Sequence, residues 1–134
     1  MQKVLLATTA LAPGLSPDAF VRLLRRRFGR RFLIGCSTHS VEEVEAAGAA
    51  GADYVVFGPI FPTPSKPGAT DLPGLPGLEH AARAGIPVLA LGGVDLRRLA
   101  DVAGAGARGA AGIRMFEDVP ALPALVERAR EVFS

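Results

Sequence analysis

The sequence predicts an α/β protein made of five consecutive parallel βα units. Five short runs of aliphatic and aromatic residues have the length of strands and are apolar on both faces, as strands buried in a parallel sheet are. A helical pattern follows each run, and glycines stand where the helices end. Strands that alternate with helices in this way are typical of a parallel sheet.

The first half of the chain contains two complete units and the start of a third. The predicted strand 4–7 is followed by Ser16 or Asp18, either of which can cap a helix that continues to residue 28. The predicted strand 32–36 precedes Ser40, and Glu43 three residues later completes a capping-box pattern. The run 54–57 is the third strand, because it joins aromatic and β-branched residues.

The second half continues the alternation. Strands are predicted at 88–91 and 110–113, and helices at 78–84, 96–103 and 122–133. Asp95 directly precedes the second of these helices. Glycines occupy the turns that lead from a helix to the next strand, where a positive φ is common. These are Gly29, Gly51, Gly85 and Gly106.

Length and composition limit the class of protein. A chain of 134 residues fits one domain, 1–134, and 49% hydrophobic against 21% charged residues supports a packed core. One cysteine and two histidines exclude a disulfide framework and a zinc finger. The sequence has no apolar run of membrane-span length and no signal-peptide pattern, so we expect no membrane partner and a cytoplasmic location.

Six arginines crowd into residues 22–31. Such a cluster could bind nucleic acid, but the sequence has no interleaved aromatic stacking surface and no recognition motif. We therefore interpret it as the solvated outer face of a helix and expect no nucleic-acid partner.

Five βα units are compatible with two architectures. They can form a small doubly wound sheet or part of a TIM (β/α)8 barrel, and a complete barrel needs about 250 residues. In both architectures the functional residues follow the carboxyl ends of the strands.

The segment after the second strand carries a candidate acid/base. His39 lies three residues beyond Cys36, with the hydroxyl groups of Ser37, Thr38 and Ser40 available to orient its ring. We predict proton transfer by His39, and the alternative is a surface or capping histidine. Cys36 is interpreted as a core residue, because an apolar setting raises a thiol pKa. The other histidine, His80, falls inside a predicted helix and is not a candidate.

The segment after the third strand is a long loop with four prolines, residues 58–68. Thr63, Ser65 and Lys66 supply two hydroxyls and a positive charge, which suit a carboxylate or phosphate ligand. The alternative is a proline-rich connection with an incidental lysine.

Two further segments follow the last two strands. Gly92 and Gly93 would let backbone N–H groups approach an oxyanion, and Ile113 and Arg114 follow the fifth strand with an added charge. A glycine pair can also serve only close packing, but two such loops in succession favour phosphate.

Five motifs taken together resemble the thiamine phosphate synthase/TenI family. They lie at 35–39, 51–54, 58–66, 86–94 and 105–109, and the resemblance extends over about residues 15–115. It implies the TIM-barrel fold, here a partial barrel of about five βα units, and a thiazole phosphate ligand.

The resemblance also implies roles for the candidate residues. Thr63 and Ser65 would hold the carboxylate region of the thiazole, while Lys66 and Ser37 would face the pyrophosphate in a synthase. The backbone of Gly93, Ile113 and Arg114 would hold the thiazole phosphate, with Gly92 in the same turn. His39 matches the acid/base histidine of TenI-type thiazole tautomerases.

The sequence also departs from the family pattern. It resembles the family from the fourth strand onward, without the first three βα units, and Ala10 stands beside Thr8 and Thr9 where synthases carry an acidic magnesium ligand. We therefore expect no metal or other cofactor in this chain, and Mg²⁺ only if a partner restores synthase activity.

The resemblance and its departures imply three candidate functions. The first is a TenI-type tautomerase in which His39 moves a proton on a thiazole phosphate. The alternatives are a thiamine phosphate synthase whose missing half is supplied, and a noncatalytic module that binds a small-molecule phosphate. The open edges of a partial barrel predict a homo-oligomer or a partner chain.

Overall fold

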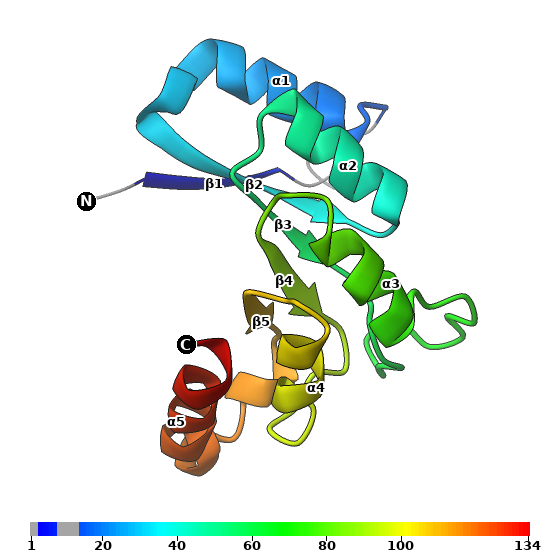
Figure 1. Cartoon of the computed structure of the whole chain (residues 1–134), viewed down its shortest axis with the longest axis vertical. Coiled ribbons are helices and arrows are strands. Elements are labelled where there is room, and N and C mark those ends of the chain that lie inside the picture. The colour runs from blue at the N-terminus through cyan, green and yellow to red at the C-terminus, as the bar shows by residue number, and fades with distance from the viewer. Residues whose placement is uncertain (1–2, 8–13) are drawn as a thin grey trace.

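A computed structural model describes residues 3–7 and 14–134, with side chains from residue 14 onward. Within this part of the chain, five strands form one sheet in the order β1-β2-β3-β4-β5, and every neighbouring pair is parallel (Figure 1). The strands are β1 (Lys3–Ala7), β2 (Phe32–Thr38), β3 (Tyr54–Phe57), β4 (Val88–Leu91) and β5 (Gly109–Ala111).

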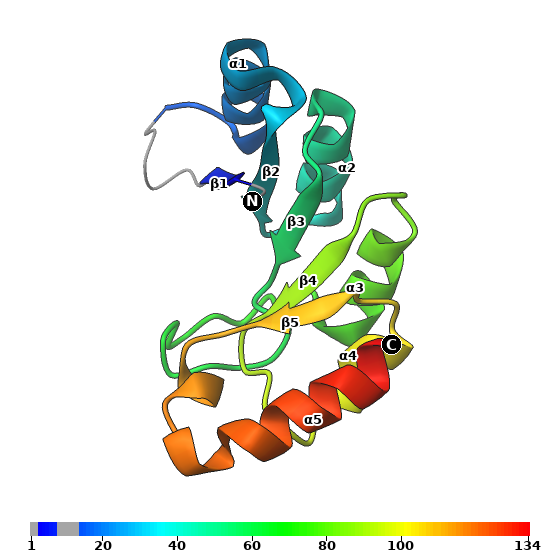
Figure 2. The ribbon, with the colours of Figure 1, turned by 90° about the vertical axis from the view of Figure 1, so that its left-hand side faces the viewer.

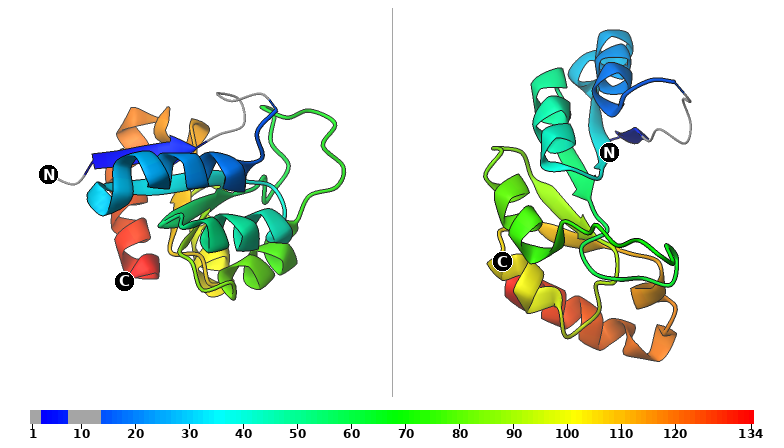
Figure 3. Two further views of the ribbon diagram at one scale, coloured as in Figure 1. Left: turned by 90° about the horizontal axis from the view of Figure 1, so that it is seen from above. Right: turned by 90° about the vertical axis from the view of Figure 1, so that its right-hand side faces the viewer.

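A helix follows each strand. The α-helices are α1 (Pro17–Phe28), α2 (Val41–Ala50), α3 (Gly74–Ala82), α4 (Leu99–Gly104) and α5 (Leu122–Phe133), and 3-10 turns occupy Gly29–Arg31, Arg114–Phe116 and Val119–Ala121. Helices α1 to α4 lie side by side along one face of the sheet, as Figures 2 and 3 show.

This arrangement decides between the two architectures that the sequence left open. A doubly wound sheet reverses its strand order at a switch point and places helices on both faces. Here the strands follow chain order and the helices form one layer, so the described chain is five βα units of a partial TIM (β/α)8 barrel.

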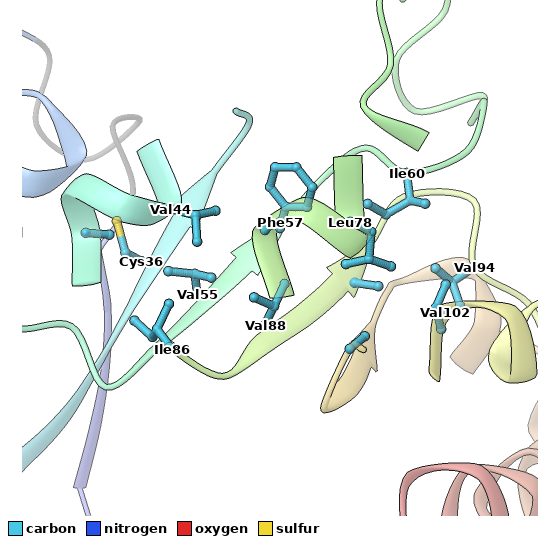
Figure 4. Close-up of a cluster of buried hydrophobic side chains, with 14 of the residues drawn as sticks. Cys36, Val44, Val55, Phe57, Ile60, Leu78, Ile86, Val88, Val94 and Val102 are labelled. Atoms are coloured by element: carbon cyan, nitrogen blue, oxygen red, sulfur yellow. The ribbon is translucent and has the colours of Figure 1, made fainter. Parts of the chain in front are cut away.

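The core lies between the sheet and this helix layer. Cys36, Val55, Phe57 and Val88 point from the strands toward the helices and belong to one buried cluster with helix residues such as Val44 and Leu78 (Figure 4). Strand side chains alternate between faces, so Leu33, Val56 and Leu89 lie on the opposite face. That face is less covered, and Leu33 is 36% exposed.

Several predicted elements are confirmed. Strands β3 and β4 and helix α5 have the predicted bounds. Ser16 is the N-cap of helix α1, and its Oγ accepts from the Ala19 N–H at 3.4 Å. Ser40 is the N-cap of helix α2, and its Oγ accepts from the Glu43 N–H at 3.2 Å. The glycines predicted at the turns all have positive φ; they are Gly29, Gly51, Gly85 and Gly106.

Other boundaries differ from the prediction. Helix α4 begins at Leu99 instead of residue 96, because the Asp95 carboxylate accepts from the N–H groups of Arg97 and Arg98, both at 3.1 Å, and holds a turn there. Helix α3 covers Gly74–Ala82 instead of 78–84, and the positive φ of Gly85 redirects the chain after it. Strand β5 ends at Ala111, before residues 112 and 113, because a 3-10 turn begins at Arg114.

The arginine-rich segment is an outer helix face, as predicted. Arg22, Arg26 and Arg27 are exposed, whereas Arg25 turns inward. The Arg25 guanidinium donates to the Gly51 carbonyl and pairs with the Asp53 carboxylate at 2.7 Å, which ties α1 to the turn before β3. In the described residues no helix is long and apolar enough to cross a membrane.

Candidate active site

A cavity of about 490 Å³ opens at the carboxyl ends of the strands. This volume suits a small ligand, since such sites usually measure about 300–1,000 Å³. The lining residues come from the segments that follow β2, β3, β4 and β5. They include Thr38, His39, Pro59, Thr63, Ser65, Lys66, Gly92, Gly93, Asp95, Arg98, Ile113, Arg114 and Met115.

His39 directly follows β2, and the Glu43 carboxylate contacts both its backbone and its ring. Its backbone N–H donates to Glu43 Oε2 at 2.7 Å, and its ring Nδ1 lies 3.4 Å from the same oxygen. The Ser40 hydroxyl caps the helix that carries Glu43. With Nδ1 beside a carboxylate, Nε2 is the ring nitrogen left for a ligand, and the imidazole is about half exposed.

The partner of His39 differs from the sequence prediction. The neighbouring hydroxyls were expected to orient the ring, but Thr38 is buried and its hydroxyl donates to the Val56 carbonyl at 3.0 Å. The ring of His39 lies beside the Glu43 carboxylate instead. The capping-box pattern drew attention to Glu43 only as a helix-start residue, although the same spacing brings its carboxylate beside His39.

The loop between β3 and α3 brings Thr63, Ser65 and Lys66 to the cavity. The Ser65 N–H donates to Thr63 Oγ1 at 3.4 Å and the Lys66 N–H to the Thr63 carbonyl at 3.1 Å, so the segment forms a local turn. Ser65 and Lys66 are exposed, which leaves a hydroxyl and an ammonium group available to a ligand.

The glycine pair after β4 packs tightly against this loop. Gly92 and Gly93 have φ values of +98° and +65°, and a Cβ on Gly93 would lie 2.7 Å from the Pro62 carbonyl oxygen. The Phe61 N–H donates to the Gly92 carbonyl at 3.0 Å. The pair therefore allows close packing between two loops, and both residues also line the cavity.

Two charged residues of the site were missed by the sequence analysis. Arg98 Nη1 donates to the Gly93 carbonyl at 2.7 Å, and its guanidinium carbon lies 4.5 Å from the centroid of the Phe61 ring. Asp95 holds the turn that precedes Arg98. Asp95 was noticed only as a helix-start residue, and nothing in the local pattern marked Arg98.

The structure brings most of the predicted site residues around one cavity. His39, Thr63, Ser65, Lys66, Gly92, Gly93, Ile113 and Arg114 all line it. Ser37 does not, because the alternation of β2 turns it, like its register partner Val56, to the less covered face of the sheet. Ile113 is 76% exposed at the rim.

Cys36 and His80 lie outside the cavity, as expected. Cys36 is fully buried, and this burial, with the Glu43 and Asp18 carboxylates adding to it, raises the pKa of the thiol to about 11. A thiol with so high a pKa is a poor nucleophile. His80 is exposed on α3.

The described residues do not fit a magnesium site. No three His, Cys, Asp or Glu side chains of residues 14–134 come together in a group that could hold a metal. Asp95 is the acidic residue that lines the cavity, and its carboxylate already accepts two N–H groups. Thr8, Thr9 and Ala10, the predicted position of the missing acidic ligand, lie outside the described residues.

Fold and cavity together define a barrel-type βα protein with a ligand-sized site at the carboxyl ends of its strands. The family described as thiamine monophosphate synthase matches residues 16–116. The chain therefore belongs to the thiamine monophosphate synthase family, as the resemblance implied, and this membership supports a role in thiamine biosynthesis.

Curated relatives and a solved structure are consistent with this family. Thiamine-phosphate synthase of Thermosynechococcus vestitus is 44% identical over 98 residues, which is 72% of this chain and 28% of that protein. Thiamine-phosphate synthase of Acidothermus cellulolyticus is 42% identical, over 77% of this chain and 50% of that protein. The chain thus spans about half or less of the length of these relatives.

A similar solved structure is thiamine phosphate pyrophosphorylase from Pyrococcus furiosus. It superposes with a TM-score of 0.74 at 26% identity and covers 99% of this chain and 69% of that one.

Proposed function

We propose that the cavity binds a thiazole phosphate carboxylate and that His39 moves a proton on it, as in TenI-type thiazole tautomerases. The observation that carries this proposal is that His39 faces the same cavity as Lys66, Arg114 and the Gly92–Gly93 turn. His39 offers an acid/base on one side of the cavity, and the other lining segments offer positive charges and backbone groups that suit an anionic ligand.

The chemistry needs only a proton carrier and a fixed ligand. Nε2 of His39 takes a proton from one carbon of the ligand, and the imidazolium returns a proton at another position of the same conjugated system. Composition and oxidation state stay unchanged, so no co-reactant is consumed. Glu43, beside Nδ1, stabilises the imidazolium that forms between the two steps.

The first experiment joins a binding measurement to an exchange measurement. The purified chain is titrated with thiazole phosphate carboxylate by calorimetry, and proton NMR of the same samples follows tautomerisation. The H39Q variant should bind within about threefold of the wild-type affinity and lose 100-fold or more of its turnover, since general acid–base catalysis contributes about 10²–10⁴-fold. H80Q, which changes the histidine outside the cavity, is the matched control. An H39Q variant that keeps full turnover would refute the acid/base role.

Lys66 tests the anion site separately from the chemistry. The K66A variant should weaken binding of the thiazole phosphate by at least about tenfold, because a charged hydrogen bond contributes about 1.5–3 kcal/mol. K66R, which keeps the charge, should retain most of the affinity. Unchanged affinity in K66A would mean that the loop is only a connector.

The relatives favour a second candidate function, because both curated relatives described above are named thiamine-phosphate synthases. A synthase would join the thiazole phosphate to a pyrimidine pyrophosphate with loss of pyrophosphate. The described residues offer no magnesium site, so this reaction needs groups beyond them. Addition of pyrimidine pyrophosphate and Mg²⁺ to the first experiment tests it: thiamine phosphate as product favours the synthase. Binding without exchange or product would indicate a noncatalytic module.

The fold also supports a partner for this chain. We infer that a second copy or another chain covers the sheet face that carries Leu33, Val56 and Leu89, together with the outer edges of β1 and β5. An apolar sheet face and two unpaired edges favour association in water.

A further inference from the structure

We propose that Arg98 is a positioning residue, which fixes the loop that carries Thr63, Ser65 and Lys66 against the Gly92–Gly93 turn and so sets the affinity of the cavity for an anionic ligand. The inference deepens the proposed function and rests on it for the ligand, but the loop geometry can be tested without any ligand.

Three groups meet at this point. Arg98 Nη1 donates to the Gly93 carbonyl at 2.7 Å, and the flat guanidinium stacks on Phe61 with 4.5 Å between its carbon and the ring centroid. The Arg98 backbone N–H donates to Asp95 Oδ1 at 3.1 Å, which fixes the start of the side chain. Arg98 therefore contacts both the turn after β4 and the loop after β3.

Phe61 is the residue through which this contact reaches the binding loop. Its N–H donates to the Gly92 carbonyl at 3.0 Å, and a Cβ on Gly93 would lie 2.8 Å from the Phe61 Cβ. Beyond Phe61, the hydrogen bonds of the Ser65 and Lys66 N–H groups within the described chain end on Thr63, inside the loop. The position of Lys66 relative to the glycine turn therefore depends on the anchor at Phe61.

The geometry favours positioning over direct binding. One guanidinium nitrogen is used by a protein carbonyl, and one face of the group is covered by an aromatic ring. A planar cation suits this double contact, because it can stack and donate at the same time. Lysine could reach the carbonyl but could not stack in the same way.

Amide hydrogen exchange tests the geometry without ligand. In R98A the amides of Ile60 and Phe61, which donate to the Leu91 and Gly92 carbonyls across the two loops, should exchange about tenfold faster than in the wild type, because this contact opens more often. R97A removes a neighbouring arginine that does not line the cavity and whose side-chain partner is Asp95, so it should leave these rates unchanged. F61L, which keeps an apolar side chain but removes the ring, should act in the same direction as R98A and remains informative if R98A fails to fold.

Calorimetry with thiazole phosphate carboxylate tests the consequence. R98A should raise Kd about tenfold, and in the tautomerase assay KM should rise by more than kcat falls; R98K should recover only part of the affinity. Exchange rates in R98A and F61L that equal the wild-type rates would overturn the positioning role. Full recovery by R98K would overturn the stacking contribution. A wild-type chain that binds no thiazole phosphate would contradict the proposed function, and the exchange rates would still decide the role of Arg98.

Discussion

Two glycines in this chain both allow close packing of loops and line the cavity. Gly92 and Gly93 line the cavity, and their missing side chains also let Pro59, Phe61 and Pro62 approach the turn. A side chain on Gly92 would meet the Pro59 Cα at 2.6 Å. Glycine at these two positions therefore lets the turn after β4 pack closely against the loop after β3. A larger residue at either position would push that loop away.

Cys36 gives a prediction at the residue scale. Burial raises its pKa from 9.0 to about 11 in the folded chain. Between these values the unfolded chain releases the thiol proton and the folded chain keeps it, so the free energy of unfolding falls as the pH rises from 9 toward 11. Urea unfolding across this pH range should show that fall, and it should be smaller in C36V.

Alkylation provides an independent measurement for Cys36. Iodoacetamide at pH 8 should modify the unfolded chain readily and the folded chain at least about 100-fold more slowly, because the thiol is both buried and protonated. Rapid alkylation of the folded chain would contradict the core position of Cys36.

At the scale of the element, the first turn of α2 contains both a helix cap and a contact with the candidate site. Ser40 caps the helix by accepting from the Glu43 N–H, and the Glu43 carboxylate accepts from the His39 N–H. The cap, the helix start and His39, the proposed acid/base, therefore form one connected unit. A change in the cap should reach the chemistry through Glu43.

A pair of cap variants tests this connection. S40A and S16A each remove the side-chain acceptor of a helix N-cap and should each lower the free energy of unfolding by about 1 kcal/mol in urea denaturation. S16A lies at the start of α1, outside the cavity, so only S40A should also lower the tautomerisation rate. Equal turnover in the two variants would show that α2 does not position His39.

At the scale of the whole molecule, the sheet is covered unevenly. Its helix-facing side chains are buried, whereas Leu33 on the other face remains 36% exposed. In a closed barrel that face is the interior, which side chains fill. The described part of this chain forms an open arc whose inner face carries apolar side chains, and the proposed partner would cover that face.

Light scattering coupled to size-exclusion chromatography tests this expectation. The purified chain should elute as a concentration-dependent oligomer, and L33E should shift it toward the monomer, because a charge is placed on the uncovered face. L23E changes a similarly exposed leucine on the outer face of α1 and is the matched control. A stable monomer at every concentration would contradict the need for a partner.

Much of the fold followed from local patterns. The ranges of β3, β4 and α5, the caps at Ser16 and Ser40 and the turn glycines are set by periodicity and short-range hydrogen bonds, which the sequence displays directly. The start of α4 and the end of β5 were less predictable, because the Asp95 turn and the 3-10 turn at Arg114 compete with the regular elements.

The candidate site was predicted in the same uneven way. Residues that directly follow a strand, such as His39 and Lys66, could be found because parallel strands bring their carboxyl ends together. Arg98 could not be predicted, because its contacts with Gly93 and Phe61 depend on how two loops fold against each other. No local sequence pattern shows that arrangement. Ser37 does not line this cavity, because the alternation of β2 turns it to the sheet face opposite the helices, and its predicted role stays a prediction.

The sequence by itself determined the order of the elements, the family and a set of candidate residues most of which line the cavity, since these depend on local periodicity and on short motifs. The tertiary structure alone decided that the strands follow chain order with one layer of helices, that Glu43 holds His39, and that Arg98 joins two loops. The physical reason is that packing and long-range hydrogen bonds depend on which faces and loops meet, and local patterns do not encode that choice uniquely.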